Sequence, residues 1–307
     1  MNLLSEIKSE NWINKAPEEK LGELTVIFFW NLSSRKSLNV VPFVNKIYDE
    51  IRSKNFQVIG IHSAEFDFEE NLELLKDKLK KLGINWPVMI DEGKEIKNKL
   101  NQRNPMLYLL NKNADSIFEH FDDVFLEKFA SKLLVESGRN SGKFYESDHV
   151  HTSSCVNPTN DLYFGYKKGA YKTEGGEFMD AISDFEFPQN IVSNSMQLSG
   201  KFLTTSEYVQ SESKNCKVLI NFSARRVDLV LENTLNHEVS LSIGGKKLDG
   251  EIQGRDIEGS IINYAEAGNC NLVLSEKVIN ENLQLALQEG VRLYKVEFSG
   301  CLRANHD

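Results

Sequence analysis

Hydrophobic residues follow different patterns in the two halves of the chain. In the first half, continuous apolar runs at 25–30 and 56–62 alternate with stretches in which apolar residues recur every three or four positions. Continuous runs indicate strands that are buried on both faces, and the three-to-four spacing indicates amphipathic helices. The first half is therefore predicted to be an α/β domain.

Helical spacing covers residues 40–51 and 72–82, and Gly83 is placed to end the second of these helices. The polar turn 111–115 separates two short apolar runs, which predicts a β-hairpin. A further strand is predicted at 86–90. The two hairpin strands are predicted at 106–110 and 116–120, and the last helix at about 122–136.

Strict alternation of apolar and polar residues replaces this pattern in the second half. It occurs at 218–224, 239–243, 283–287 and 294–298, with Gly244-Gly245 as a turn signal. Short alternating strands predict an all-β antiparallel sandwich, specifically a jelly roll. A Ser-, Gly- and Asn-rich stretch separates the halves, so the predicted domains are 1–136 and 161–307, with a linker at 137–160.

Composition narrows the function classes. The 307 residues suffice for two domains, and 40% hydrophobic and 26% charged residues are typical of globular proteins. A net charge of -9 without a basic block argues against nucleic-acid binding. We expect no membrane-spanning segment and no signal peptide, which fits a cytoplasmic protein, or an envelope or periplasmic one whose leader was removed.

Several short motifs occur in a fixed order in the first half. Trp30 ends the first strand and precedes Asn31-Leu32-Ser33-Ser34-Arg35-Lys36-Ser37. The segments 58–66 and 84–88 and the dipeptide Asn104-Pro105 follow. With Trp12-Ile13-Asn14 before them, these motifs resemble the TlpA-like thioredoxin group, and most of all the soluble region of DipZ-type proteins, over about residues 11–136.

The resemblance implies a thioredoxin fold and descent from thiol-disulfide oxidoreductases linked to cytochrome c biogenesis. Such proteins carry C-x-x-C where this sequence has Ser34 and Ser37, and a cis-proline where it has Pro105. A serine hydroxyl stays protonated near neutral pH and forms no disulfide, whereas the chemistry needs a thiolate. The site is thus expected to be degenerate, with no catalytic residue and no cofactor.

Three interpretations of the loop remain open. In the first, Ser34, Arg35, Lys36 and Ser37 form with Pro105 an anion- or peptide-binding edge at a helix start. In the second, the loop has drifted and serine serves only as a helix N-cap. The third, engineered replacement of two cysteines by serine, would not account for the Arg-Lys pair.

The second half resembles the carbohydrate-binding-module-like sandwich of DipZ-type proteins at 161–166 and 224–231. Its aromatic residues would form a sugar-stacking platform if they are exposed, and core packing is the alternative. The candidates for this platform are Tyr163, Phe164, Tyr166, Tyr171 and Tyr208.

The four cysteines, Cys155, Cys216, Cys270 and Cys301, all lie in the second half, and no C-x-x-C is present. Buried unpaired thiols and a structural disulfide both remain open. His149 and His151 with Cys155 have the composition of a metal site, but they lie in the predicted linker without a second cluster, so no metal is expected. His62 ends a buried strand and is interpreted as a core histidine.

The sequence thus favours a redox-inactive thioredoxin-like binding or scaffold protein rather than an enzyme. Its expected partner is a protein or peptide at the degenerate site, with carbohydrate as a second ligand class at the sandwich. Two alternatives remain: a thiol-disulfide oxidoreductase that uses the distant cysteines, and a carbohydrate-binding envelope protein.

Overall fold

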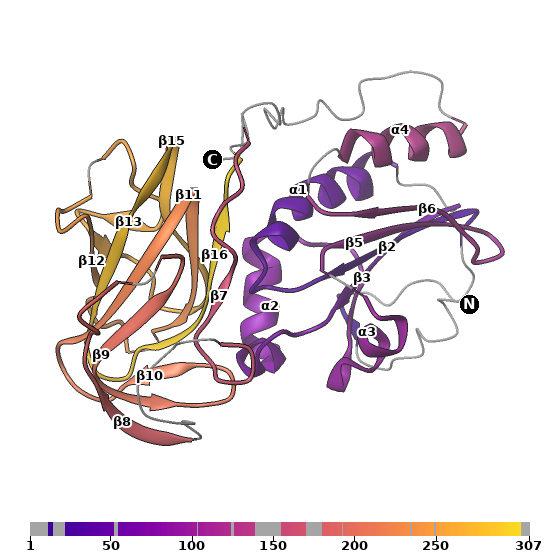
Figure 1. The fold of residues 1–307 in the computed structure, drawn as a ribbon. Helices are drawn as coiled ribbons and strands as arrows, with labels where there is room; N and C mark the ends of the chain where they lie inside the picture. Colours follow the sequence, from indigo (N-terminus) through magenta and orange to yellow (C-terminus); the bar gives the residue numbers. More distant parts are fainter. Residues whose placement is uncertain are drawn as a thin grey trace. The chain divides into compact units, whose positions relative to one another are not determined.

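The computed structural model describes residues 12–14, 22–51, 55–102, 104–123, 126–138, 155–169, 180–191, 193–233, 235–248 and 250–301. The chain divides into two compact units, residues 1–147 and 148–307. The described helices all lie in the first unit, and the second is built of strands (Figure 1). Each unit has its own apolar core.

The first unit contains a six-stranded sheet with the order β1-β4-β3-β2-β5-β6. The neighbours β2, β3 and β4 are parallel, whereas β1, β5 and β6 join antiparallel. This mixed order confirms the expected α/β fold of thioredoxin type. The strands are Trp12–Ile13 (β1), Leu24–Trp30 (β2), Phe56–His62 (β3), Val88–Ile90 (β4), Met106–Asn111 (β5) and Ser116–Phe121 (β6).

Helices cover both faces of this sheet, so that β2 is buried along its whole length. Val26 and Phe28 share a core with α1, α2 and α4, while Ile27 and Phe29 face the side of α3 (Figure 1). The helices are Arg35–Glu50 (α1), Leu72–Lys81 (α2), Glu95–Leu100 (α3) and Leu126–Glu136 (α4), with short 3-10 turns at Asp67–Glu70 (η2) and Glu92–Lys94 (η3).

Local signals explain most of these boundaries. Asn71 caps α2 because its side chain accepts the backbone N–H groups of Glu73 and Leu74, and Gly83 follows the helix with a φ of +66°. Helix α4 begins at Leu126 and not near residue 122, where the sequence predicted it, although its end at Glu136 agrees. The short helix α3 was not predicted.

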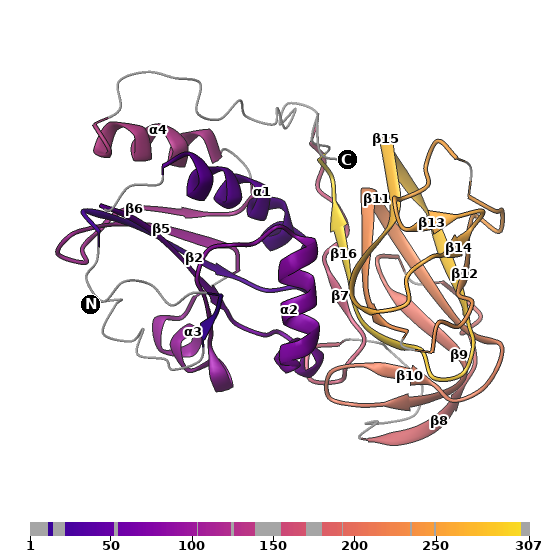
Figure 2. The ribbon, with the colours of Figure 1, turned by 180° about the vertical axis from the view of Figure 1, so that it is seen from behind.

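The second unit is an antiparallel sheet of ten strands with the order β13-β14-β12-β15-β11-β16-β10-β9-β8, and β7 pairs with β16. Strands β12 to β14 lie together at one side of this unit (Figure 2). The strands are Leu162–Tyr163 (β7), Ala181–Phe185 (β8), Met196–Thr204 (β9), Val209–Ser211 (β10), Cys216–Glu232 (β11), Ser240–Ile243 (β12), Ile257–Glu258 (β13), Ile261–Ile262 (β14), Ala267–Leu287 (β15) and Arg292–Ser299 (β16).

Strand β11 lets this sheet fold back on itself. Its first part pairs with β9 and its second part with β16, and β10 pairs with both of those strands. The four strands therefore form a closed circuit that encloses apolar side chains such as Phe202 and Leu293. The antiparallel all-β character is as predicted, while the finer jelly-roll assignment stays a prediction.

The segment at 155–160 is attached to the second unit. Thr159 donates its N–H to the carbonyl of Ser223 at 2.9 Å, and Val156 donates to the carbonyl of Gly300 at 3.3 Å. The predicted linker, 137–160, is thus bound at its C-terminal end, and the domain boundaries remain a prediction. Within the part of the chain that the structure describes, no helix has the length and apolar character needed to cross a membrane.

Candidate functional site

The serine loop, residues 31–37, connects the end of β2 to the start of α1. Ser34 has extended backbone angles and is the N-cap of α1, because its Oγ accepts the backbone N–H of Ser37 at 3.3 Å. Serine is a preferred N-cap because it satisfies one of the N–H groups that a helix start leaves unpaired. Ser34 therefore caps α1, as in the second of the three interpretations of the loop.

The other hydroxyls of the loop are also engaged. Ser37 donates its Oγ–H to Asn31 Oδ1 at 3.3 Å, and Asn31 Nδ2 donates to Ser33 Oγ at 3.0 Å. Ser33 and Ser37 are fully buried, and Ser34 is 7% exposed. Neither Ser34 nor Ser37 is therefore presented to solvent as a free nucleophile.

The basic pair in the loop is oriented differently. Arg35 is half-buried, whereas Lys36 is exposed and lies 3.5 Å from the carboxylate of Asp122 at the end of β6. Burial raises the pKa of Asp122, but hydrogen bonds from Asp123 and the positive charge of Lys36 outweigh it and lower that pKa. The ion pair thus ties the start of α1 to the end of β6.

A buried carboxylate that the sequence did not single out accepts hydrogen bonds from the backbone of this loop. Glu69 accepts the backbone N–H groups of Leu32 at 2.7 Å and Ser33 at 3.3 Å. Its other oxygen accepts the N–H groups of Glu65 at 3.0 Å and Phe66 at 3.2 Å. One side chain thereby joins the serine loop to the turn that follows β3.

His62, at the end of β3, lies beside this carboxylate, with 3.5 Å between its Nε2 and Glu69 Oε2. Burial raises the pKa of Glu69, but the contact and charge of His62 and the hydrogen bond with Ser33 overcome it, so the pKa is held below its usual range. His62 is 1% exposed, in agreement with its interpretation as a core histidine.

Trp30 and Pro105 flank the loop. The Asn104–Pro105 peptide bond is cis, as the resemblance implied. The pairing of Phe29 with Met106 brings Pro105 next to the end of β2. Trp30 is fully buried, with its ring 5.2 Å from that of His62. Trp30 and Pro105 thus both lie near the end of β2, from which the serine loop starts.

An exposed phenylalanine at the same edge was missed from the sequence. Phe121 ends β6 directly opposite Met106 and is 69% exposed. Its neighbour Asp122 pairs with Lys36. Phe121 is therefore a large exposed apolar side chain next to the residue that pairs with Lys36.

The predicted sugar platform in the second unit is only partly available. Phe164 is fully buried in the core, so it cannot stack on a ligand. Tyr163 lies under Lys168 at 4.8 Å, and the Tyr166 hydroxyl is 3.4 Å from each carboxylate oxygen of Asp180.

The remaining tyrosines do not form a continuous sugar-stacking platform either. The Tyr208 ring packs at 5.2 Å against that of Tyr294 and lies 5.0 Å below Arg292. Tyr171 lies outside the described residues. The three half-buried tyrosines, 163, 166 and 208, thus have three separate sets of neighbours.

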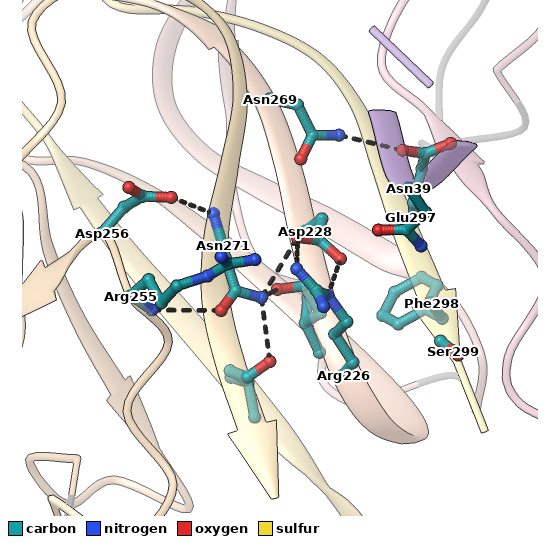
Figure 3. Close-up of polar contacts among 12 residues, drawn as sticks. Asn39, Arg226, Asp228, Arg255, Asp256, Asn269, Asn271, Glu297, Phe298 and Ser299 are labelled. Atoms are coloured by element: carbon teal, nitrogen blue, oxygen red, sulfur yellow. Dashed lines mark hydrogen bonds and ion pairs between the residues drawn. The ribbon is translucent and has the colours of Figure 1, made fainter. Parts of the chain in front are cut away.

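A paired charge cluster lies on β11 and β15 (Figure 3). Arg226 donates two hydrogen bonds to Asp228, at 2.7 and 3.2 Å, and Asn271 Nδ2 donates to the same carboxylate at 3.1 Å. Asp256 accepts the N–H of Asn271 at 2.7 Å, while Asn271 Oδ1 accepts the N–H of Arg255 at 3.1 Å. Because these groups satisfy one another, the cluster serves to fix strand register.

The cysteines divide into two kinds. Cys155 and Cys301 form a disulfide with Cα atoms 4.6 Å apart, while Cys216 and Cys270 are free and buried. Burial raises the pKa of Cys270 well above its usual value, and the nearby carboxylates of Asp256 and Asp228 raise it further.

The disulfide also bears on the suggested metal site, since Cys155 is already paired. His149 and His151 lie outside the described residues, and among those the structure describes no group of three or more potential metal ligands occurs.

Comparison with known proteins agrees with both units. Residues 159–298 match the family described as "Thioredoxin like C-terminal domain". DipZ of Mycobacterium tuberculosis and of Mycobacterium bovis are each 23% identical over 221 residues, which is 69% of this chain and 32% of DipZ. The chain therefore spans about a third of the length of these curated relatives.

Shorter relatives match the first unit. The thioredoxin-like protein SkfH of Bacillus subtilis is 23% identical over 126 residues, covering 40% of this chain and 87% of SkfH. A thiol-disulfide isomerase structure from Corynebacterium glutamicum is 25% identical with a TM-score of 0.37, covering 43% of this chain and 93% of that one. Residues 159–298 are thus similar to a thioredoxin-like C-terminal domain, and the chain is similar at low identity to relatives of DipZ type.

Proposed function

We propose that this chain is a redox-inactive binding protein of thioredoxin fold, in which the serine loop docks an extended segment of a partner protein. The observation that carries the proposal is the state of Ser34 and Ser37. They occupy the cysteine positions, and their hydroxyls cap α1 and bond Asn31. The first 154 residues contain no cysteine, so the unit that carries the serine loop has no thiol of its own.

Disulfide exchange needs a thiolate to attack and a second thiol to release the mixed disulfide. Neither group is available at the serine loop. The relatives named for thiol-disulfide chemistry support the ancestry of the fold, and the serines argue that this chain retains the surface without the chemistry.

Three features favour docking at this edge. Pro105 lies directly before the start of β5, Phe121 offers a large exposed apolar side chain, and Lys36, ion-paired with Asp122, adds a polar group on the rim. An extended segment with an apolar residue suits such an edge, because its side chain can cover Phe121 while its backbone lies along the loop.

Loss of redox activity is tested by insulin reduction with dithiothreitol. The purified chain is expected to leave the rate at its uncatalysed value. Catalysis that persists through a second, independent purification would overturn the redox-inactive assignment.

Docking is tested on an array of cysteine-free 12-residue peptides, using the full chain. Phe121→Ser should weaken binding of the preferred peptides at least tenfold. Val135→Ser is the matched control, since Val135 is also an exposed apolar residue, at 73%, but lies on α4. Equal binding by the two variants would remove Phe121 from the docking edge.

The alternatives find less support. An oxidoreductase based on the other cysteines would need a reactive pair, whereas Cys216 and Cys270 are buried. The alternative carbohydrate site at the tyrosines lacks one of its candidate residues, because Phe164 is buried in the core.

We retain a jelly roll as the proposed topology of the second unit.

A further inference from the structure

Strand β8 is an open edge of the sheet in the second unit (Figure 1). It pairs with β9 on one side, from Ala181 opposite Thr204 to Phe185 opposite Gly200. Among the described residues, no strand and no backbone hydrogen bond engages its other side. An edge strand leaves a row of N–H and C=O groups unpaired. The strand at the other end of the sheet, β13, has two residues, whereas β8 has five, so β8 is the longer template for strand addition.

The side chains of β8 give this edge an apolar and an acidic element. Phe185 is buried in the core of the unit, and side chains alternate between the two faces of a strand. Ile182 and Asp184 therefore share the face away from the core, and both are exposed, Ile182 to 57%. The half-buried Leu203 lies opposite Ile182 on β9, so two aliphatic side chains lie together next to the open edge.

The charges along this edge are all negative. Asp180, Asp184 and Glu186 lie on or directly beside β8, and residues 180–191 contain no lysine, arginine or histidine. Lys201 lies opposite Asp184 on β9, yet within the part of the chain that the structure describes neither Asp184 nor Glu186 forms an ion pair. The carboxylate of Asp184 is thus available to a cation from outside the sheet.

A second copy of the chain is poorly suited to this edge. Antiparallel pairing of two β8 strands would bring the carboxylates of one copy against the same carboxylates of the other, and like charges on neighbouring strands are destabilising. A strand with basic side chains has the opposite effect, because each cation then lies beside a carboxylate. An apolar side chain between two basic ones would at the same time cover Ile182.

We propose that β8 binds an extended segment of a partner protein by strand addition, and that one face of this segment alternates basic with β-branched residues. The backbone of the segment pairs with the open side of β8, a basic side chain pairs with Asp184, and a β-branched side chain covers Ile182. This site lies in the second unit and does not depend on the serine loop or on Phe121.

The probe is the fluorescein-labelled peptide Ser-Gly-Lys-Thr-Val-Thr-Lys-Gly-Ser, whose binding to the full chain is measured by fluorescence anisotropy. The wild type should bind it, and Asp184→Lys should weaken binding about tenfold. Glu258→Lys is the matched control and should leave the affinity unchanged, because Glu258 is also an exposed acidic residue but lies on β13. A peptide with glutamate in place of both lysines should bind Asp184→Lys more tightly than it binds the wild type.

Two results of this titration would overturn the proposal: no binding of the lysine peptide by the wild type, or equal weakening by Asp184→Lys and Glu258→Lys. Phe121→Ser should leave the affinity for this peptide unchanged, which keeps the test separate from that of the serine loop. Loss of binding in Phe121→Ser would instead place the peptide at the serine loop and overturn the assignment to β8.

A second peptide tests whether the backbone takes part. N-methylation of its valine and both threonines removes N–H groups that strand pairing needs and leaves the charge unchanged, so binding should weaken about tenfold. Equal binding of the methylated peptide would reduce the contact to side-chain charge and overturn strand addition. Analytical ultracentrifugation should give a monomer. A dimer that the lysine peptide dissociates would make a second copy the occupant of β8 and also overturn the proposal.

Discussion

The carboxylate of Glu69 accepts the backbone N–H of Leu32 at 2.7 Å across 37 positions of sequence. Through this contact the serine loop is held by the turn after β3. The loop's geometry therefore depends on one buried carboxylate.

Glu69→Gln should lower the free energy of unfolding at pH 7 by about 2 kcal/mol, because an amide presents an N–H group to backbone donors. Chemical denaturation measures the change. The control Glu73→Gln alters an exposed side chain that pairs with Lys76, and it should change stability by less than about 0.5 kcal/mol.

The buried carboxylate of Glu69 also predicts that the stability of the fold depends on pH. The pKa of Glu69 is lowered in the folded state, so its ionised form stabilises the fold above the pKa of an unfolded glutamate, about 4.3. That contribution is lost as the pH falls through the folded-state pKa. The stability difference between the wild type and Glu69→Gln should therefore shrink in acid, and a difference that stays constant down to about pH 2 would contradict this assignment.

Restoring two thiols tests whether the framework of the degenerate site is intact. Ser34→Cys with Ser37→Cys places two thiols one helical turn apart, where Cα separations of roughly 4.4–6.8 Å allow a disulfide. Mild oxidation followed by peptide mapping should find a reversible 34–37 disulfide, with weak insulin reduction. The single variant Ser34→Cys should show neither. Failure of the pair to oxidise would show that the register of the serine loop is wrong.

The Cys155–Cys301 disulfide closes a loop with a sequence separation of 146 residues, so its removal should destabilise the second unit by about 2–5 kcal/mol. Dithiothreitol should lower the melting temperature of the wild type and leave that of Cys155→Ser/Cys301→Ser unchanged. If dithiothreitol lowers the melting temperature of both proteins equally, the decrease does not come from reduction of this disulfide.

The free thiols should be unreactive in the native state. Cys216 and Cys270 are buried, and the pKa of Cys270 is raised, so little thiolate is available at pH 8. Iodoacetamide should label no cysteine of the folded chain and two after denaturation without reductant, as counted by mass spectrometry. Labelling of Cys270 in the folded chain would contradict its burial.

Patterns within one element were sufficient for much of the fold. The apolar run of β2, the helical spacing of α1 and α2 and the alternation around β11 each reflect local burial, which short windows record. The N-cap role of Ser34 follows from the same local logic. The length of β11 was harder to predict, because its 17 residues pair with β9 in one part and β16 in another.

The missed features depend on contacts between distant segments. Glu69 has the sequence context of an ordinary surface glutamate. Two of its four N–H donors, Glu65 and Phe66, are local, but the other two belong to the distant serine loop, which no short window of sequence reveals. Cys155 and Cys301 are too far apart in sequence for their spacing to predict a bond. The exposure of Phe121 likewise follows from its place at the end of an edge strand.

The disulfide also joins the first and the last described residues of the second unit. The Cα atoms of Cys155 and Cys301 are 4.6 Å apart, close to the roughly 3.8 Å that a single trans peptide bond spans. A direct peptide link between these positions could therefore replace the sulfur bridge. New termini could be placed at the exposed turn Gly244-Gly245. The unit is therefore well suited to circular permutation.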